Sequence, residues 1–64
     1  MAPIRVVVAD DSYLVRQAVA HVLDDVDHIE VVAACGDRDA LLRAVERERP
    51  QVVVTDIRMP PSAT

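Results

Sequence analysis

Two runs of aliphatic residues in this chain end in carboxylates. Residues 4–9 are followed by Asp10 and Asp11, and residues 52–55 are followed by Asp56. Apolar residues at consecutive positions are typical of strands buried on both faces of a parallel sheet, whose carboxyl ends meet at one edge. Three carboxylates gathered there repel one another unless a cation neutralises them, and oxygen ligands suit a hard divalent ion such as Mg2+. The spacing therefore predicts a metal site.

Each acidic residue also has a simpler explanation when it is taken alone. Asp10 and Asp11 fit a turn or a helix N-cap, where aspartate is common, and Asp56 fits an ordinary strand end. Their combination at two strand ends favours a site over these explanations. His21 and His28 have no carboxylate or thiol at ligand spacing, so we expect both to be solvated.

Composition excludes several classes of function. The chain has 64 residues, and a chain of about 60 residues buries only about 60% of its unfolded surface, so one small domain is the most it can form. A formal net charge of −4 argues against direct nucleic-acid binding. Cys35 is the only cysteine, so no internal disulfide can form, and we expect it to be a small buried hydrophobic residue. Without a signal peptide or a bilayer-spanning apolar run, a cytoplasmic protein without membrane contact is expected.

Two amphipathic helices are predicted between the strands. Beyond Ser12, a suitable N-cap, pairs of apolar residues recur every four positions as far as Val26. A second helix follows the turn at Gly36, and Pro50 ends it because proline disfavours helical geometry in the preceding residue. A strand over residues 29–35 separates the two helices. The order is therefore β-α-β-α-β with short connections.

This order predicts an α/β fold with a doubly wound parallel sheet. Glu30 lies near the start of the second strand and indicates an edge position, which puts the first strand in the middle and gives the spatial order 2-1-3. Open sheets of this kind bind ligands at the carboxyl ends of the strands where the order reverses. Those strands are the two that end in Asp10-Asp11 and Asp56.

Two motifs resemble a known family. Ala9-Asp10-Asp11-Ser12 after the first strand and Asp56-Ile57-Arg58-Met59-Pro60-Pro61 after the third resemble the receiver domain of bacterial two-component response regulators. The second motif is most like regulators that carry a LuxR/NarL-type helix-turn-helix output domain. The resemblance implies a flavodoxin-like receiver fold, of which residues 1–64 would be the N-terminal part.

The resemblance also implies a role for each acidic residue. Asp56 would be the phosphoacceptor, and Asp11, Asp56 and the backbone carbonyl of Arg58 would ligate Mg2+ directly. Asp10 would act on the metal mostly through water. A receiver also uses a Ser or Thr after a fourth strand and a Lys after a fifth, and these positions lie beyond the 64 residues.

The function implied by the family is signalling. A histidine kinase would transfer a phosphoryl group to Asp56 and so control a transcriptional output domain. The protein would not be an enzyme beyond its own phosphoryl transfer and hydrolysis. Other receiver domains would be partners in a dimer, and DNA would be bound only through the output domain.

Three other functions compete with this one. A truncated receiver could act as a binding or dimerisation module without phosphorylation. An aspartyl-phosphate phosphatase of the haloacid-dehalogenase type needs Asp-x-Asp-x-Thr after the first strand, whereas this chain has Asp10-Asp11-Ser12-Tyr13. A dinucleotide-binding fold needs a glycine-rich phosphate loop, and Gly36 is the only glycine.

Overall fold

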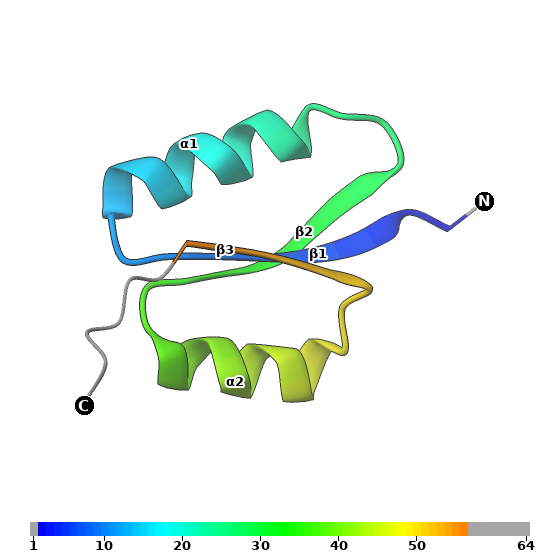
Figure 1. Ribbon diagram of the computed structural model, residues 1–64. Helices are drawn as coiled ribbons and strands as arrows, with labels where there is room; N and C mark the ends of the chain where they lie inside the picture. Colours follow the sequence, from blue (N-terminus) through cyan, green and yellow to red (C-terminus); the bar gives the residue numbers. More distant parts are fainter. Residues whose placement is uncertain (1, 57–64) are drawn as a thin grey trace.

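Three parallel strands and two helices make up the fold (Figure 1). The computed structural model describes residues 2–56; residues 1 and 57–64 are outside the description. The elements are β1 (Ile4–Asp10), α1 (Tyr13–Asp24), β2 (Ile29–Cys35), α2 (Arg38–Glu48) and β3 (Val52–Asp56). The sheet order is β2-β1-β3 with parallel pairing throughout. The predicted element order, the parallel sheet and the central first strand are confirmed.

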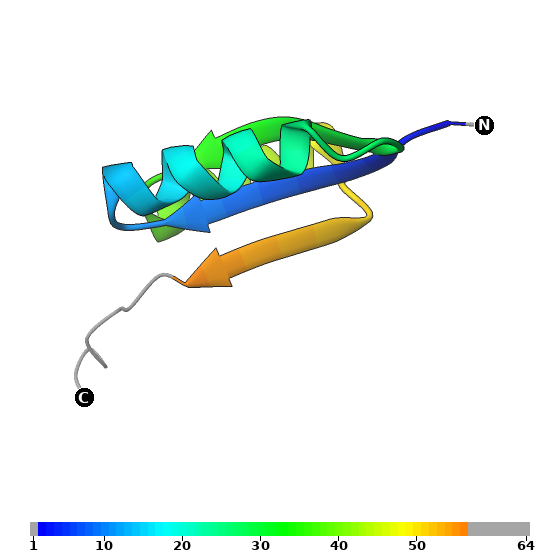
Figure 2. The same ribbon diagram turned by 90° about the horizontal axis from the view of Figure 1, so that it is seen from above.

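The two helices cover opposite faces of the sheet, with α1 on one side and α2 on the other (Figure 1). Both helices pack against β1 and β2, and neither contacts β3 within residues 2–56. Seen from above, β3 lies beside the area that α1 covers (Figure 2). The helices therefore cover two of the three strands.

Strand β1 supplies most of the core. Val7 and Ala9 pack with Cys35 and Ala44 on the side of α2. Because side chains alternate along a strand, Val6 and Val8 project to the opposite side, and both are buried. Residues 6–9 of the first apolar run are therefore buried on both faces, as predicted, whereas Ile4 at its start is exposed.

Strand β3 differs from that expectation. Val52, Val53 and Val54 are 44%, 38% and 39% exposed, although their sequence is as apolar as that of β1. The physical reason is position: β3 pairs with β1 on one side, and no helix in the described part of the chain packs on it. The expectation that this strand is buried on both faces is wrong for residues 52–55.

Each helix begins at a side-chain cap. The hydroxyl of Ser12 accepts a hydrogen bond from the backbone N–H of Val15 at 3.4 Å, and Asp37 Oδ1 accepts one from Ala40 N–H at 2.8 Å. Such caps satisfy N–H groups that have no partner within the helix. They place the first turn of each helix directly after the carboxyl end of the preceding strand.

A cluster at the opposite end of the sheet aligns β3 with β1. The backbone N–H of Gln51 donates to Arg5 O at 2.9 Å, and the N–H of Arg5 donates to Gln51 Oε1 at 3.0 Å. The guanidinium of Arg5 also forms an ion pair with Glu48, with 2.9 Å between Nη2 and Oε1. These bonds join the end of α2 and the start of β3 to the start of β1.

Candidate functional site

Two acidic strand ends meet at the carboxyl edge of the sheet. Asp10 is the last residue of β1 and Asp56 the last residue of β3, and the parallel ladder pairs them directly. The pairing continues back along the strands through Ala9 with Thr55 and Val8 with Val54. The backbone thus brings together two acidic residues that are far apart in the sequence.

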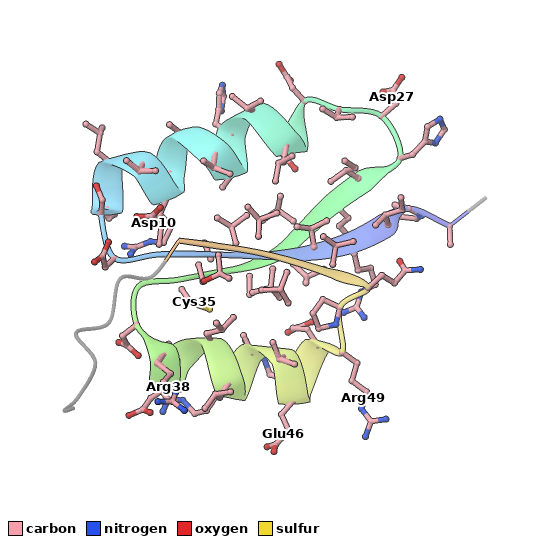
Figure 3. All side chains as sticks on the ribbon, in the orientation of Figure 1. Asp10, Asp27, Cys35, Arg38, Glu46 and Arg49 are labelled. Carbon is pink, nitrogen blue, oxygen red and sulfur yellow. The ribbon has the colours of Figure 1, made fainter. Side chains whose placement is uncertain are left out.

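Asp10 is a buried carboxylate at the end of β1, near the start of α1 (Figure 3). It is only 6% exposed, and its Oδ1 accepts a hydrogen bond from the backbone N–H of Ser12 at 2.8 Å. An ionised carboxylate has about four lone-pair sites, so this single hydrogen bond leaves room for a water molecule or a cation. Asp11, the next residue, is exposed at the turn between β1 and α1.

Arg16 is a residue of this edge that the sequence did not indicate. Its Nη1 donates to the backbone carbonyl of Asp10 at 3.0 Å, and its guanidinium carbon lies 5.2 Å from the centre of the Tyr13 ring. In the helical pattern Arg16 falls on the polar side of α1, which suggests a solvated side chain. The Arg16 guanidinium lies against Gly36, and no pattern in the sequence connects these two residues.

Cys35 lies at the carboxyl end of β2, between the sheet and α2 (Figure 3). It is 5% exposed, and its thiol donates to the carbonyl of Ala40 at 3.6 Å. Burial raises the pKa of the thiol, which keeps it protonated at neutral pH. The prediction of a small buried residue is confirmed.

The other predicted site residues have a mixed outcome. The backbone of Asp56 is in place, while its side chain and all of Arg58 lie outside what the structure describes. His21 and His28 are exposed, in agreement with the expectation of solvated side chains. Among the side chains that are described, no three His, Cys, Asp or Glu residues are grouped closely enough to hold a metal ion. The assignment of metal ligands therefore stays a prediction.

The donor set nevertheless suits Mg2+. Carboxylate oxygens are the ligands that this ion prefers, and a cation offsets the repulsion between neighbouring acidic groups. A buried aspartate at the end of β1, next to an exposed one and paired with a third on β3, supplies that chemistry. None of the helices in residues 2–56 is long and apolar enough to cross a membrane.

Comparison with known proteins identifies the family. Residues 6–63 match the response regulator receiver domain. This chain belongs to that family. The receiver sheet order and the acidic edge described above agree with the membership.

Relatives of this receiver are parts of much longer proteins. A protein-glutamate methylesterase/protein-glutamine glutaminase of Anaeromyxobacter dehalogenans is 47% identical over 58 residues, which are 91% of this chain and 16% of that protein. Proteins with the same description from Rhodospirillum rubrum and Haloarcula marismortui are 41% and 42% identical, over 91% and 89% of this chain and 15% of each protein. The receiver chain thus spans about a sixth of the length of the curated relatives it matches.

These relatives overturn one expectation. A signalling protein without enzymatic activity was expected, but the relatives are named as a methylesterase and glutaminase, which are enzymes. They also lend no support to the LuxR/NarL-type class or to transcriptional output. The receiver assignment does not depend on either point, because it rests on the family match.

Proposed function

We propose that this receiver accepts a phosphoryl group from a histidine kinase on Asp56, with Mg2+ bound at the acidic edge. The observation that carries the proposal is the direct pairing of Asp10 with Asp56 in the parallel ladder of a receiver-family chain. This pairing gathers the acidic strand ends at the switch point of the sheet, where open α/β folds bind ligands. A histidine kinase as donor also favours the cytoplasm as the compartment.

The acidic residues have different roles in metal binding. Asp11, Asp56 and the backbone carbonyl of Arg58 would hold Mg2+ directly, and Asp10 would act mostly through water. Asp10 is buried, and its carboxylate already accepts a hydrogen bond from Ser12 N–H. Both observations favour an indirect role in metal binding for Asp10. When bound, Mg2+ supplies positive charge that offsets the oxygens of the phosphoryl group.

The chemistry is a single in-line displacement. A carboxylate oxygen of Asp56 forms a bond to phosphorus while the bond from phosphorus to the donor breaks, and the donor leaves with that electron pair. The product is an acyl phosphate on Asp56. An acyl phosphate hydrolyses readily, which suits a transient signal.

We further propose that residues 1–64 are the N-terminal part of a receiver that controls an enzymatic output. The relatives support an esterase or glutaminase activity for that output. We also propose that the intact protein forms dimers through contacts with other receiver domains. A DNA-binding output domain is the alternative, because the sequence motif at residues 56–61 resembles that of LuxR/NarL-type regulators.

The decisive experiment uses the full-length protein with a small acyl-phosphate donor and Mg2+. Intact-mass measurement should show one added phosphoryl group, and Asp56→Asn should abolish the addition. Glu46→Gln is the matched control, because Glu46 is an exposed carboxylate on α2. Uptake that survives Asp56→Asn would contradict the assignment. No uptake by the unaltered protein would favour the phosphorylation-independent binding module.

The output is tested in the same preparation. Hydrolysis of a glutamyl methyl ester should change when the donor is added, and this change should be absent in Asp56→Asn. Phosphorylation that alters DNA binding and leaves ester hydrolysis untouched would favour the transcriptional alternative.

A further inference from the structure

The side chain of Arg16 connects the two turns at the carboxyl edge of the sheet. Its backbone N–H bonds to Ser12 O at 2.9 Å in the first turn of α1. Its Nη1 reaches back to the carbonyl oxygen of Asp10 at 3.0 Å. The residue is half-buried, and its guanidinium lies against Gly36 at the turn between β2 and α2.

Gly36 makes room for this contact. A β-carbon at Gly36 would lie 2.5 Å from Arg16 Nη1 and 3.3 Å from Arg16 Cζ. Gly36 does not adopt a positive φ angle, so its backbone conformation is one that other residues also adopt. A side chain at this position would therefore displace the guanidinium of Arg16.

The hydrogen bond controls the peptide that leads into Asp11. A peptide group is planar, so fixing the carbonyl oxygen of Asp10 also fixes the orientation of the N–H of Asp11. The donor is a charged guanidinium, which forms stronger hydrogen bonds than a neutral donor. The side chain of Asp10 is held independently by Ser12 N–H at 2.8 Å. The turn that carries both acidic residues is thus held from two sides.

We propose that Arg16 is a positioning residue for the acidic edge. By holding the Asp10 carbonyl against the turn at Gly36, it preorganises Asp10 and Asp11 for a divalent cation and, through that cation, for phosphorylation. The inference rests on the proposed function and adds a residue pair, Arg16 and Gly36, to it. Arg16 acts through Asp10 and has no contact with the cation in this role.

Gly36→Ala tests the proposal without changing Arg16 itself. The new methyl group displaces the guanidinium, because the far end of a flexible side chain gives way more easily than backbone. We expect Gly36→Ala and Arg16→Met each to raise the Kd for Mg2+ about tenfold, the lower end of losses caused by removing support behind metal ligands. Arg16→Lys should bind Mg2+ almost as weakly as Arg16→Met, because an ammonium lacks the planar, forked donor geometry of the guanidinium.

A double variant provides the sharpest readout. If Gly36→Ala acts only by displacing Arg16, the Arg16→Met/Gly36→Ala variant should bind Mg2+ no more weakly than Arg16→Met alone. Arg43→Met is the matched control, because it removes an exposed arginine from α2 and should leave the Kd unchanged. Calorimetric titration of the full-length protein with Mg2+ gives the Kd, and denaturant unfolding shows that each variant is folded.

The outcomes separate the inference from the proposed function. Folded Arg16→Met and Gly36→Ala variants with an unchanged Kd would overturn the role of Arg16 and leave phosphorylation of Asp56 intact. Fully additive effects in the double variant would overturn the coupling of Gly36 to Arg16. If Arg16→Met does not fold, Gly36→Ala and Arg16→Lys decide the question. Failure of the unaltered protein to bind Mg2+ or to take up phosphate would overturn both.

Discussion

Asp10 and Asp56 end their strands as direct partners in the β1–β3 ladder. At the other end of these strands, Gln51 and Arg5 are joined by two hydrogen bonds, at 2.9 and 3.0 Å. The same number of residues separates Arg5 from Asp10 as separates Gln51 from Asp56. Because parallel strands advance at nearly the same rise per residue, a register set at the start brings both acidic residues to the edge together.

Substitution of the two neighbouring aspartates should affect metal binding unequally. We expect Asp10→Ala to weaken Mg2+ binding about tenfold, as for a group behind the direct ligands, and Asp11→Ala to weaken it more. The reason is that Asp10 is buried and already accepts a hydrogen bond from Ser12 N–H, whereas Asp11 is exposed. Calorimetric titration of both variants with Mg2+ measures the difference. Equal losses of Mg2+ affinity in the two variants would contradict the assignment of Asp11 as a direct ligand and Asp10 as an indirect one.

Stability should depend on pH through Glu48. The hydrogen bond from Arg47, followed by the charges of Arg47 and Arg5, lowers the pKa of the Glu48 carboxyl. A lowered pKa in the folded state means that the ionised carboxylate stabilises the fold above the ordinary glutamate pKa of about 4.3, and that this contribution is lost as the pH falls through the lowered value. Glu48→Gln should therefore be less stable than the unaltered chain at pH 7, and the gap should close in acid.

Urea unfolding between pH 7 and pH 3 measures this gap. Glu46→Gln is the control, because Glu46 lies exposed on the same helix and should show a much smaller pH-dependent difference. A gap for Glu48→Gln that stays constant down to pH 3 would mean that the ionisation of Glu48 does not stabilise the fold.

The residue that ends α2 is a site for stabilisation. Arg49 has φ 48° and ψ 60°, in the left-handed region, and its N–H donates to Val45 O at 2.8 Å. This conformation costs an L-residue about 1–2 kcal/mol, whereas glycine adopts it freely. Glycine also increases the conformational entropy of the unfolded chain, which offsets part of this gain. Arg49→Gly should therefore raise the free energy of unfolding by about 0.5–1 kcal/mol. Arg49→Ala keeps the β-carbon and should give no such gain in denaturant unfolding; equal effects of the two variants would contradict the explanation.

The exposed edge of β3 should make the 64-residue chain self-associate. Val53 is 38% exposed on a strand that pairs only with β1 among the described residues. Apolar strand edges with unpaired N–H and C=O groups recruit further strands, and a lysine on the edge opposes this. Val53→Lys should therefore lower the association seen by sedimentation at increasing concentration. Val26→Lys, a matched change in the loop after α1, should not.

Hydrogen exchange supplies a second measurement of the same edge. Backbone N–H groups alternate sides along a strand, and Gln51 N–H donates to Arg5 on β1, so the N–H groups of Val52 and Val54 face the open edge. These amides should exchange quickly in dilute solution and slow down as the chain associates. A monomer at every concentration, with these amides strongly protected, would show that the three-stranded sheet is self-sufficient.

Local pattern alone determined the order of the elements. The change from consecutive apolar residues to pairs four apart separates strands from helices, because each structure buries its own periodicity. Glu30 at the start of β2 indicated an edge strand and hence the order β2-β1-β3, which the structure confirms. The positions of Asp10 and Asp56 at strand ends followed from the same pattern.

Tertiary structure alone decided which valines are buried and what Arg16 does. Val7 of β1 is fully buried and Val53 of β3 is 38% exposed, although both lie in runs of three valines. Burial depends on which strands and helices flank a residue, and the local amino-acid sequence does not contain that information. Arg16 and Gly36 likewise meet only because β1 and β2 are neighbours that end at the same edge of the sheet. Contacts between residues distant in sequence form when the chain packs, and no local periodicity predicts them.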